Sequence, residues 1–358
     1  MDALTTPSNW QRVRLGDIAN YLTSNLSAEQ ITQQGKIKVY DVNNFIGYTN
    51  TTFISDKPYI SIVKDGSVGR VRILPPKTNI LSTMGALIAN HKTTTEFLFY
   101  LLSNFDFKNF TSGSIIPHIY FKDYKEKTIF LPPLNEQIAI ANILSDVDRY
   151  LYNLDALILK KESVKKALSF ELLSQRKRLK GFNQAWQRVR LGDIANYLTS
   201  NLSAEQITQQ GKIKVYDVNN FIGYTNTTFI SDKPYISIVK DGSVGRVRIL
   251  PPKTNILSTM GALIANHKTT TEFLFYLLSN FDFKNFTSGS IIPHIYFKDY
   301  KEKTIFLPPL NEQIAIANIL SDVDSEIISL KNKKRQFENI KKALNHDLMS
   351  AKIRVLKK

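Results

Sequence analysis

An exact internal repeat constrains this chain of 358 residues more than any other feature. Residues 10–148 return without a single change as residues 186–324, and the two copies differ immediately before and after this segment. Folding requires only that a repeat keep its apolar pattern and its turn residues, so identity at exposed positions reflects the history of the sequence. Two long copies predict two complete globular domains, because a solenoid needs many short repeats.

The composition limits the class of protein. Hydrophobic residues make up 43% of the chain, which is enough for two cores of ordinary domain size. The absence of cysteine excludes disulfides and thiolate metal sites and is typical of a reducing compartment. We find no signal-peptide pattern and no apolar run near the roughly 20 residues of a membrane helix. These features predict a soluble, cytoplasmic protein with no membrane segment.

The net charge of +16 is concentrated in the two non-identical segments, residues 149–185 and 325–358. A basic excess of this kind favours a polyanionic partner, most simply nucleic acid. A lysine-rich helix that is merely solvated would also account for it.

Both basic segments carry a seam of residues at alternating steps of four and three, which predicts two long helices that pair as a coiled coil. Gly181 is expected to end the first helix near residue 179. The alternative, in which each helix lies on its own domain, remains open. The seams are Val147, Leu151, Leu154, Ile158, Lys161, Lys165, Leu168 and Leu172, and then Val323, Ile327, Leu330, Lys334, Phe337, Lys341, Leu344 and Leu348.

Each repeat shows mixed α and β signals. Clustered or alternating β-forming residues predict strands, and residues 95–105 have helical spacing. Asn135 and Glu136, after a pair of prolines, predict a helix start. The repeat is therefore expected to fold as an α+β domain with strands at 36–42, 59–63, 69–74 and 127–131.

No catalytic or metal-binding constellation accompanies the histidines of the repeat, His91 and His118. The segment DGSVG at 65–69 lacks the remaining residues of a phosphate-binding loop, and a turn between two strands explains it better. We therefore expect a chain that performs no chemistry itself and holds no metal.

Three segments together carry a family resemblance. They are WQRVRLGDI at 10–18, LPPLNEQIAIANILSDVD at 131–148 and KKALSFELLSQRKRL at 165–179; the second copy opens at Trp186 and ends in KKALNHDLMSAKIRV at 341–355. This order of segments resembles the specificity subunit of type I restriction-modification systems, and the resemblance covers nearly the whole chain.

The resemblance implies a fold with two target-recognition domains joined by two long antiparallel helices about a pseudo-twofold axis. The expected boundaries are 1–148 for the first domain, 149–180 for the central spacer helix, 181–324 for the second domain and 325–358 for the distal spacer helix. Because the two domains are identical, they are expected to read identical, inverted half-sites on double-stranded DNA, separated by an unread gap.

The resemblance also implies the partners. Two modification subunits would bind S-adenosylmethionine and methylate adenine, and restriction subunits would translocate or cleave DNA with ATP and magnesium. No cofactor is expected in this chain.

Two segments of each repeat are candidates for DNA contact, because they combine basic and polar side chains with irregular backbone. One surrounds the DGSVG turn and the other follows Gly113. The candidates are Lys57, Tyr59, Lys64, Ser67, Arg70, Arg72, Lys77, Ser112, Ser114, His118, Tyr120 and Lys122, with the copies Lys233, Tyr235, Lys240, Ser243, Arg246, Arg248, Lys253, Ser288, Ser290, His294, Tyr296 and Lys298. Solvated charges on an edge hairpin are the alternative for every one of them.

The lysines of the helices raise a separate hypothesis. The resemblance suggests that Lys160, Lys161, Lys165, Lys166 and their counterparts face DNA phosphates over the unread gap. Two other functions remain open. One is a non-catalytic scaffold whose duplicated domains bind protein partners, and the other is an enzyme with an unrecognised site.

Overall fold

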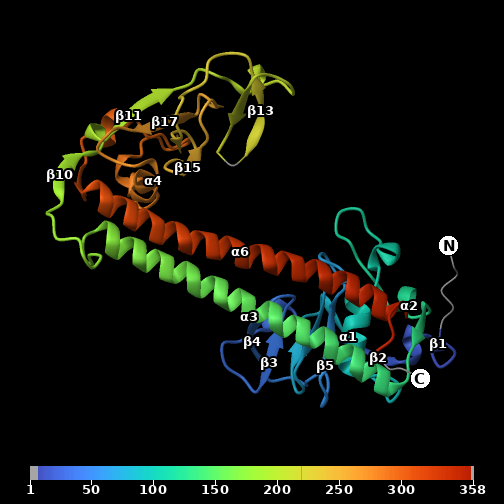
Figure 1. Ribbon diagram of the computed structural model, residues 1–358. Helices are drawn as coiled ribbons and strands as arrows, with labels where there is room; N and C mark the ends of the chain where they lie inside the picture. Colours follow the sequence, from blue (N-terminus) through green and yellow to red (C-terminus); the bar gives the residue numbers. More distant parts are fainter. Residues whose placement is uncertain (1–6, 219, 356–358) are drawn as a thin grey trace. The chain divides into compact units, whose positions relative to one another are not determined.

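The computed structural model describes residues 7–218 and 220–355. The chain divides into two compact units (Figure 1). Unit 1 combines residues 1–155 with residues 332–358, and unit 2 comprises residues 156–331. Each unit therefore contains one copy of the repeat together with the helical segment that follows the other copy.

Unit 1 contains the first set of strands and short helices, and its helix α3 continues into unit 2. The elements are β1 (Gln11–Arg14), η1 (Leu15–Asp17), β2 (Ala19–Thr23), η2 (Ala28–Gln30), β3 (Ile37–Tyr40), β4 (Phe45–Thr49), β5 (Tyr59–Val63), β6 (Val71–Leu74), β7 (Asn79–Ile80), β8 (Met84–Ala89), α1 (Thr95–Ser103), η3 (Phe107–Phe110), α2 (Phe121–Tyr124), β9 (Thr128–Leu131) and α3 (Leu134–Leu173).

Unit 2 repeats the same order, and its helix α6 continues into unit 1. The elements are β10 (Gln187–Arg190), η4 (Leu191–Asp193), β11 (Ala195–Thr199), η5 (Ala204–Gln206), β12 (Ile213–Tyr216), β13 (Phe221–Thr225), β14 (Tyr235–Val239), β15 (Val247–Leu250), β16 (Asn255–Ile256), β17 (Met260–Ala265), α4 (Thr271–Ser279), η6 (Phe283–Phe286), α5 (Phe297–Tyr300), β18 (Thr304–Leu307) and α6 (Leu310–Met349).

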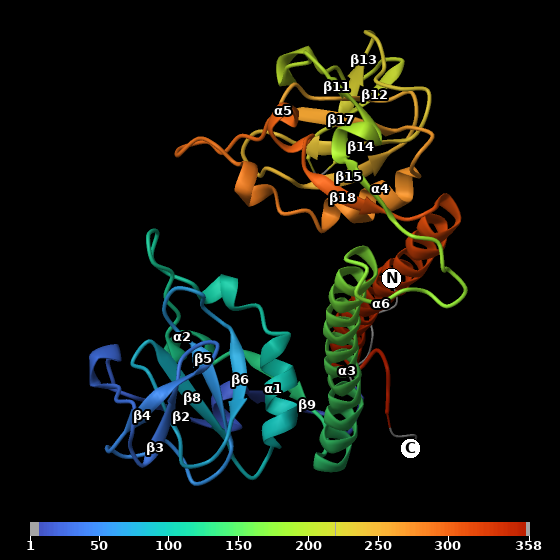
Figure 2. The same ribbon diagram turned by 90° about the vertical axis from the view of Figure 1, so that its left-hand side faces the viewer.

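The strands of unit 1 form three sheets. The largest is antiparallel with the order β2-β8-β5-β6, a second has the order β4-β3-β7 with β7 parallel to β3, and β1 pairs with β9. Helix α1 packs on the largest sheet beside β6 (Figure 2). The α+β class expected from the sequence is confirmed, and unit 2 has the same three sheets.

All five residues of the central strand β5 are buried. Because side chains alternate along a strand, both faces of β5 are therefore covered. Ile60 and Ile62 belong to the larger core, which α1 covers. Tyr59 and Val63 point the other way, into a smaller core that includes Ile80 of β7. The position of β5 between two cores decides which of its side chains are available for binding.

The first and last segments of the repeat meet and hold the start of α3. Strands β1 and β9 are antiparallel, and the indole nitrogen of Trp10 donates to Glu136, 3.2 Å away. Gln137 is fully buried and donates to the carbonyl oxygens of Lys92 and Pro132. The sequence motifs at the two ends of the repeat are thus neighbours, and their polar residues attach α3 to its domain.

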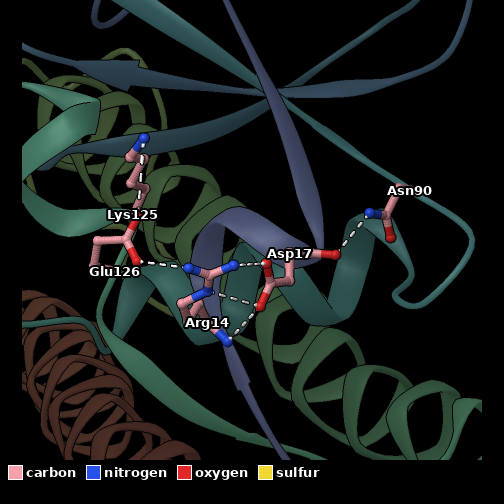
Figure 3. Close-up of polar contacts among 5 residues, drawn as sticks. All are labelled: Arg14, Asp17, Asn90, Lys125 and Glu126. Carbon is pink, nitrogen blue, oxygen red and sulfur yellow. Dashed lines mark hydrogen bonds and ion pairs between the residues drawn. The ribbon is translucent and has the colours of Figure 1, made fainter.

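Arg14 makes the corresponding contacts on the outside of the domain (Figure 3). Its guanidinium donates to Asp17 and to Glu126, each at 3.0 Å, and the amide of Asn90 donates to the carbonyl oxygen of Asp17. The hydrogen bonds from Arg14 lower the pKa of Asp17. These contacts join β1 to the segments before β9 and after β8, so they serve the fold.

The helical seams predicted from the sequence are confirmed, because every seam residue is buried or half-buried in the structure. In unit 1, Lys341 of α6 pairs with Asp148 of α3 and Lys334 pairs with Asp155, so the two helices run antiparallel. Helix α3 begins at Leu134, directly after Pro132 and Pro133, which confirms the helix start expected at Asn135 and Glu136, but it ends at Leu173, before the limit expected near residue 179. The end of sequence identity at residue 148 therefore has no structural counterpart.

Candidate nucleic-acid interface

The two candidate segments of each repeat, far apart in sequence, are joined in the structure. The backbone nitrogen of Gly66, in the turn between β5 and β6, donates to the carbonyl oxygen of Pro117 at 2.9 Å. Ile119 N donates to the carbonyl oxygen of Lys64 at the same distance, and a ring nitrogen of His118 lies 2.7 Å from Asp65. The turn and the loop after Gly113 therefore form one surface, which we call the turn–hairpin surface.

The loop is a tight hairpin with a defined shape. Ser112 and His118 exchange both backbone hydrogen bonds, at 2.9 and 2.7 Å. Gly113 has a φ of +89°, and a Cβ at this position would collide with the carbonyl oxygen of Ile116. The chain between η3 and α2 extends away from the strands of its unit (Figure 2). The hairpin is thus a projecting element with a constrained backbone.

The tip of the hairpin is apolar and exposed to solvent. The side chain of Ile115 is 93% exposed and that of Ile116 is 55% exposed. Turn tips normally carry glycine, asparagine, aspartate or serine, so two consecutive isoleucines are unusual here. The sequence interpretation missed these residues, because apolar side chains are taken as core by default. The sequence did contain an indication of them, namely two consecutive apolar residues within a segment of turn-forming residues.

Polar and basic side chains surround the base of this hairpin. Tyr120 is 48% exposed, and the ammonium of Lys122 lies 5.5 Å from the centre of its ring. The exposed members of the turn–hairpin surface from the predicted set are Ser67, Arg70, Ser112, Ser114, Tyr120 and Lys122, and Lys64 and His118 are half-buried.

Four predicted contacts in the first copy do not lie on this surface, and two of them, Tyr59 and Arg72, are engaged in contacts within the unit. Tyr59 was wrong as a DNA contact, because its side chain is fully buried and its hydroxyl lies 3.0 Å from that of Thr78. Burial raises the pKa of Tyr59 to about 12. Arg72 lies over the ring of Tyr40 and donates to the carbonyl oxygen of Asn43 at 2.8 Å, so its guanidinium joins two sheets.

Lys57 and Lys77 are exposed but lie at the other end of the β5–β6 pair. Tyr59 is opposite Leu74 in this pair, and Lys77 N donates to the carbonyl oxygen of Ser55. The five residues of β5 separate this end from the turn by about 17 Å at 3.4 Å per residue. These lysines therefore do not share one compact surface with Arg70.

A hollow of about 340 Å³ opens near that other end. Residues 22–26, Gln30, residues 51–54 and Asn79 line it. An equivalent hollow of the same volume is present in unit 2. None of these residues belongs to the set predicted from the sequence to contact DNA.

The second copy repeats the arrangement. The ring nitrogen of His294 lies 2.7 Å from Asp241, Ile291 is 93% exposed, and Tyr235 is fully buried, so Tyr235 was wrong for the same reason as Tyr59. Arg248 lies over the ring of Tyr216. The turn–hairpin surface of unit 2 contains Lys240, Ser243, Arg246, Ser288, Ser290, His294, Tyr296 and Lys298, while Lys233 and Lys253 lie at the other end.

The lysines of α3 divide into two groups. Lys161 donates to Glu326 at 2.8 Å, and Lys165 pairs with Asp324, so both contribute to helix pairing inside unit 2. Lys160 and Lys166 are exposed. Lys161 and Lys165 thus pair with carboxylates of α6 in the structure, and the hypothesis that the four lysines face DNA phosphates stays a prediction.

Within residues 7–218 and 220–355, no group of three or more histidine, aspartate or glutamate residues is placed to hold a metal ion. None of the helices in this part of the chain combines the length and apolar character that crossing a bilayer requires.

Two copies of an α+β domain, each with a projecting hairpin beside basic side chains, define a protein with two like binding units. The family described as type I restriction modification DNA specificity domain matches residues 7–161 and again residues 183–339. The chain belongs to this family. It is a type I restriction-modification specificity subunit, a DNA-recognition component that is not itself catalytic, and both of its domains serve recognition. The resemblance noted in the sequence is thereby confirmed.

Similar proteins agree with this assignment. The chain is 26% identical to the type I restriction enzyme MjaVIII specificity subunit of Methanocaldococcus jannaschii, over 99% of this chain and 95% of that protein. It is 30% identical to the putative type I specificity subunit S.MgeORF438P of Mycoplasma genitalium, over 62% of each.

Two solved structures share the fold. One is the S subunit of a type I restriction-modification system from M. genitalium, with a TM-score of 0.66, 23% identity, and coverage of 97% of this chain and 98% of that one. The other comes from a study of complex assembly and conformational transition of the type I system, with a TM-score of 0.60, 16% identity, and coverage of 97% and 99%.

Proposed function

We propose that each unit reads DNA with its turn–hairpin surface. One observation carries this proposal: hydrogen bonds between the β5–β6 turn and the projecting hairpin bring basic, polar and apolar side chains together on a rigid support. Basic side chains would bind phosphates and position the unit, and the hairpin would enter a groove and contact base edges. Ile115 at the tip would make apolar contacts there, for which a thymine methyl group is a suitable partner.

The symmetry of the target follows from the exact repeat. Two units with identical reading surfaces recognise the same short sequence, so the target should contain two identical half-sites. In each unit the helix pair is antiparallel, which supports half-sites in inverted orientation with an unread gap between them. We propose an inverted repeat as the DNA target of this chain.

We infer that two modification subunits bind this chain and supply S-adenosylmethionine-dependent adenine methylation. Restriction and translocation subunits would use ATP and magnesium, and the complex would act on DNA in the cytoplasm. A scaffold with no sequence preference is the competing function, and the family favours DNA recognition over it.

A selection from randomised duplex DNA tests the proposal. The full chain would be assembled with its modification subunits at a stated salt concentration, and the bound DNA would be sequenced. Enrichment of identical inverted half-sites with one fixed gap supports the proposal. Direct repeats or single half-sites would contradict the inverted arrangement. An intact complex that enriches no sequence would contradict DNA recognition and favour the scaffold function.

A further inference from the structure

The two helical segments that follow the repeats have a retained part and a divergent part. In the retained part, equivalent residues make equivalent contacts: Arg354 donates to Glu136 at 2.9 Å in unit 1, and Arg178 pairs with Glu312 at 2.7 Å in unit 2. The divergent parts are residues 149–163 of α3 and residues 325–339 of α6. There, equivalent positions hold different residues except at Leu154 and Leu330 and at Glu162 and Glu338.

One pair of equivalent positions is aromatic in unit 1 and ionic in unit 2. In unit 1 the rings of Tyr150 and Phe337 have centres 4.6 Å apart. In unit 2 the corresponding residues are Glu326 and Lys161, whose charged groups lie 2.8 Å apart. If α6 paired with the α6 helix of a second chain, Phe337 would meet Glu326, and the carboxylate would lose its ammonium partner in exchange for an aromatic ring.

At a second set of positions, the pairing of the two helices depends on charge. In unit 2, Lys331 pairs with Glu162 at 2.6 Å. In unit 1 the position equivalent to Lys331 is Asp155, which pairs with Lys334 at 2.7 Å. If α3 paired with the α3 helix of a second chain, Asp155 would face Glu162 with no lysine between them. The antiparallel arrangement would create this like-charge contact twice, whereas α3 with α6 creates it once, between Asp155 and Glu338, where Lys334 pairs with both carboxylates.

We propose that the divergent segments form a pairing code: residues 149–163 bind residues 325–339 and reject a second copy of themselves. Charges that flank an apolar seam select helix partners in this way in coiled coils. The code explains why the segments that follow two identical repeats are themselves not identical. Its consequence is that every helix pair combines one α3 segment with one α6 segment. This inference does not depend on how the units read DNA.

Two full-length variants with rearranged segments test the code. In the matched variant, residues 325–339 are replaced by the sequence of residues 149–163. In the exchanged variant the two sequences trade places, which keeps the composition and restores every unlike pairing. Wild-type and variant chains carrying two different tags would be co-expressed, and chains that carry the other tag would be counted after capture. Thermal unfolding would be followed in parallel.

The exchanged variant should behave as the wild type, as a single chain with the same melting temperature. The matched variant should melt roughly 2–4 °C lower, and mixed-tag dimers should rise on the order of tenfold, because several weak pairs act together. A matched variant with the wild-type melting temperature and no mixed dimers would overturn the proposal. An exchanged variant as defective as the matched one would also overturn it. Each segment would then be required by its position in the chain and not by the segment it pairs with.

A charge reversal gives an independent result at single-residue level. Glu162→Lys alone should lower the melting temperature, and Glu162→Lys with Lys331→Glu should restore it. Equal effects of the single and double variants would show that this pair does not contribute to helix pairing.

Discussion

Unit 1 and unit 2 share a globular part that is identical in sequence, and they differ mainly in the helices that complete them. Unit 1 is completed by the end of α6 and unit 2 by the end of α3. Most differences between the units therefore come from these helices. Leu168 and Leu172 of α3 pack on the core of unit 2, and Leu344 and Leu348 of α6 pack on that of unit 1.

Each helix makes two kinds of contact, one with a repeat and one with the other helix, and the two units differ in only one of them. Where a helix meets a repeat, the surface it meets is the same in both units, and Lys165 and Arg178 recur as Lys341 and Arg354. Where the helices meet each other, the chemistry diverges. Contact with an identical surface thus retains residues, and contact between two unlike partners allows them to change together.

The largest expected effect concerns the buried carboxylate of each unit. Arg354→Ala leaves Glu136, which is 2% exposed, with only the indole of Trp10 as a partner. We expect the free energy of unfolding of unit 1 to fall by about 2–3 kcal/mol, less than for a fully buried pair because the arginine is 30% exposed. Urea denaturation checks this.

Arg178→Ala is the matched control in unit 2, where Trp186 and Glu312 make the same contacts. The two variants should lower stability by similar amounts. A loss in one unit alone would contradict the conclusion that the retained residues have equivalent roles.

The next effect concerns the hairpin tips. Ile115→Ala and Ile291→Ala should each weaken binding to the selected inverted repeat about fivefold, because each removes roughly 1 kcal/mol of apolar contact. The salt dependence of binding should stay the same, since no phosphate contact is lost. Equilibrium binding at several salt concentrations measures both quantities.

Arg70→Ala and Arg246→Ala are the controls for the tip variants. If these arginines bind phosphates, their loss should reduce the log–log salt slope by about 0.9 per contact. Tip variants that bind DNA normally but no longer assemble with modification subunits would assign the hairpin to a protein contact instead.

Several elements of the fold could be predicted from the sequence because their patterns were local. The alternation in β5 and β6, the helical spacing of α1 and the seams of α3 and α6 agree with the structure. The short strands β1, β2 and β8 were not predicted, since their pairing partners lie far away in the chain.

The candidate site was predicted only in part, for a related reason. The sequence placed polar residues near the turn and the hairpin, but it contained no sign that Gly66 and Pro117 are hydrogen-bonded. It also did not show that a second sheet covers Tyr59, or that Arg72 turns toward Tyr40. Which face of a strand is covered depends on tertiary packing, so residue type alone selected the wrong tyrosine.

The two units differ in one buried polar residue next to the repeat, and a smaller effect on stability is expected there. Asn345 is 6% exposed, and among the described residues its side-chain oxygen is buried without a hydrogen-bond partner, although its nitrogen donates to the carbonyl oxygen of Tyr100. The same place in unit 2 holds Ser169, which is 2% exposed. Ser169→Asn should destabilise unit 2 by about 1 kcal/mol, because a larger amide must be buried there.

The reciprocal change, Asn345→Ser, should alter the stability of unit 1 by less than about 0.5 kcal/mol, since one hydrogen bond and one unpaired acceptor are lost together. Thermal unfolding of both variants measures the difference. If Ser169→Asn were harmless, the serine and asparagine would be interchangeable, and this difference between the units would have no energetic meaning.

The smallest effect concerns pH and should be the same in both units. The hydroxyl of Tyr100 donates to Asp148 and that of Tyr276 donates to Asp324, and burial, reinforced by these carboxylates, raises the pKa of both tyrosines. An unfolded tyrosine ionises near pH 10, so stability is complete below that pH and falls as the pH rises above it. At pH 10 each tyrosine should account for a loss of about 0.4 kcal/mol.

Tyr100→Phe and Tyr276→Phe test this through the slope of stability against pH. Each variant should show a shallower decline between about pH 9.5 and 10.5 than the wild type, and the double variant should show twice the change. The tyrosines lie in identical repeats, but the lysines above their rings, Lys341 and Lys165, come from the two different helices. Unequal slopes would therefore mean that the helices differ even where their contact residues are retained, and the separation between retained and divergent parts would have to be redrawn.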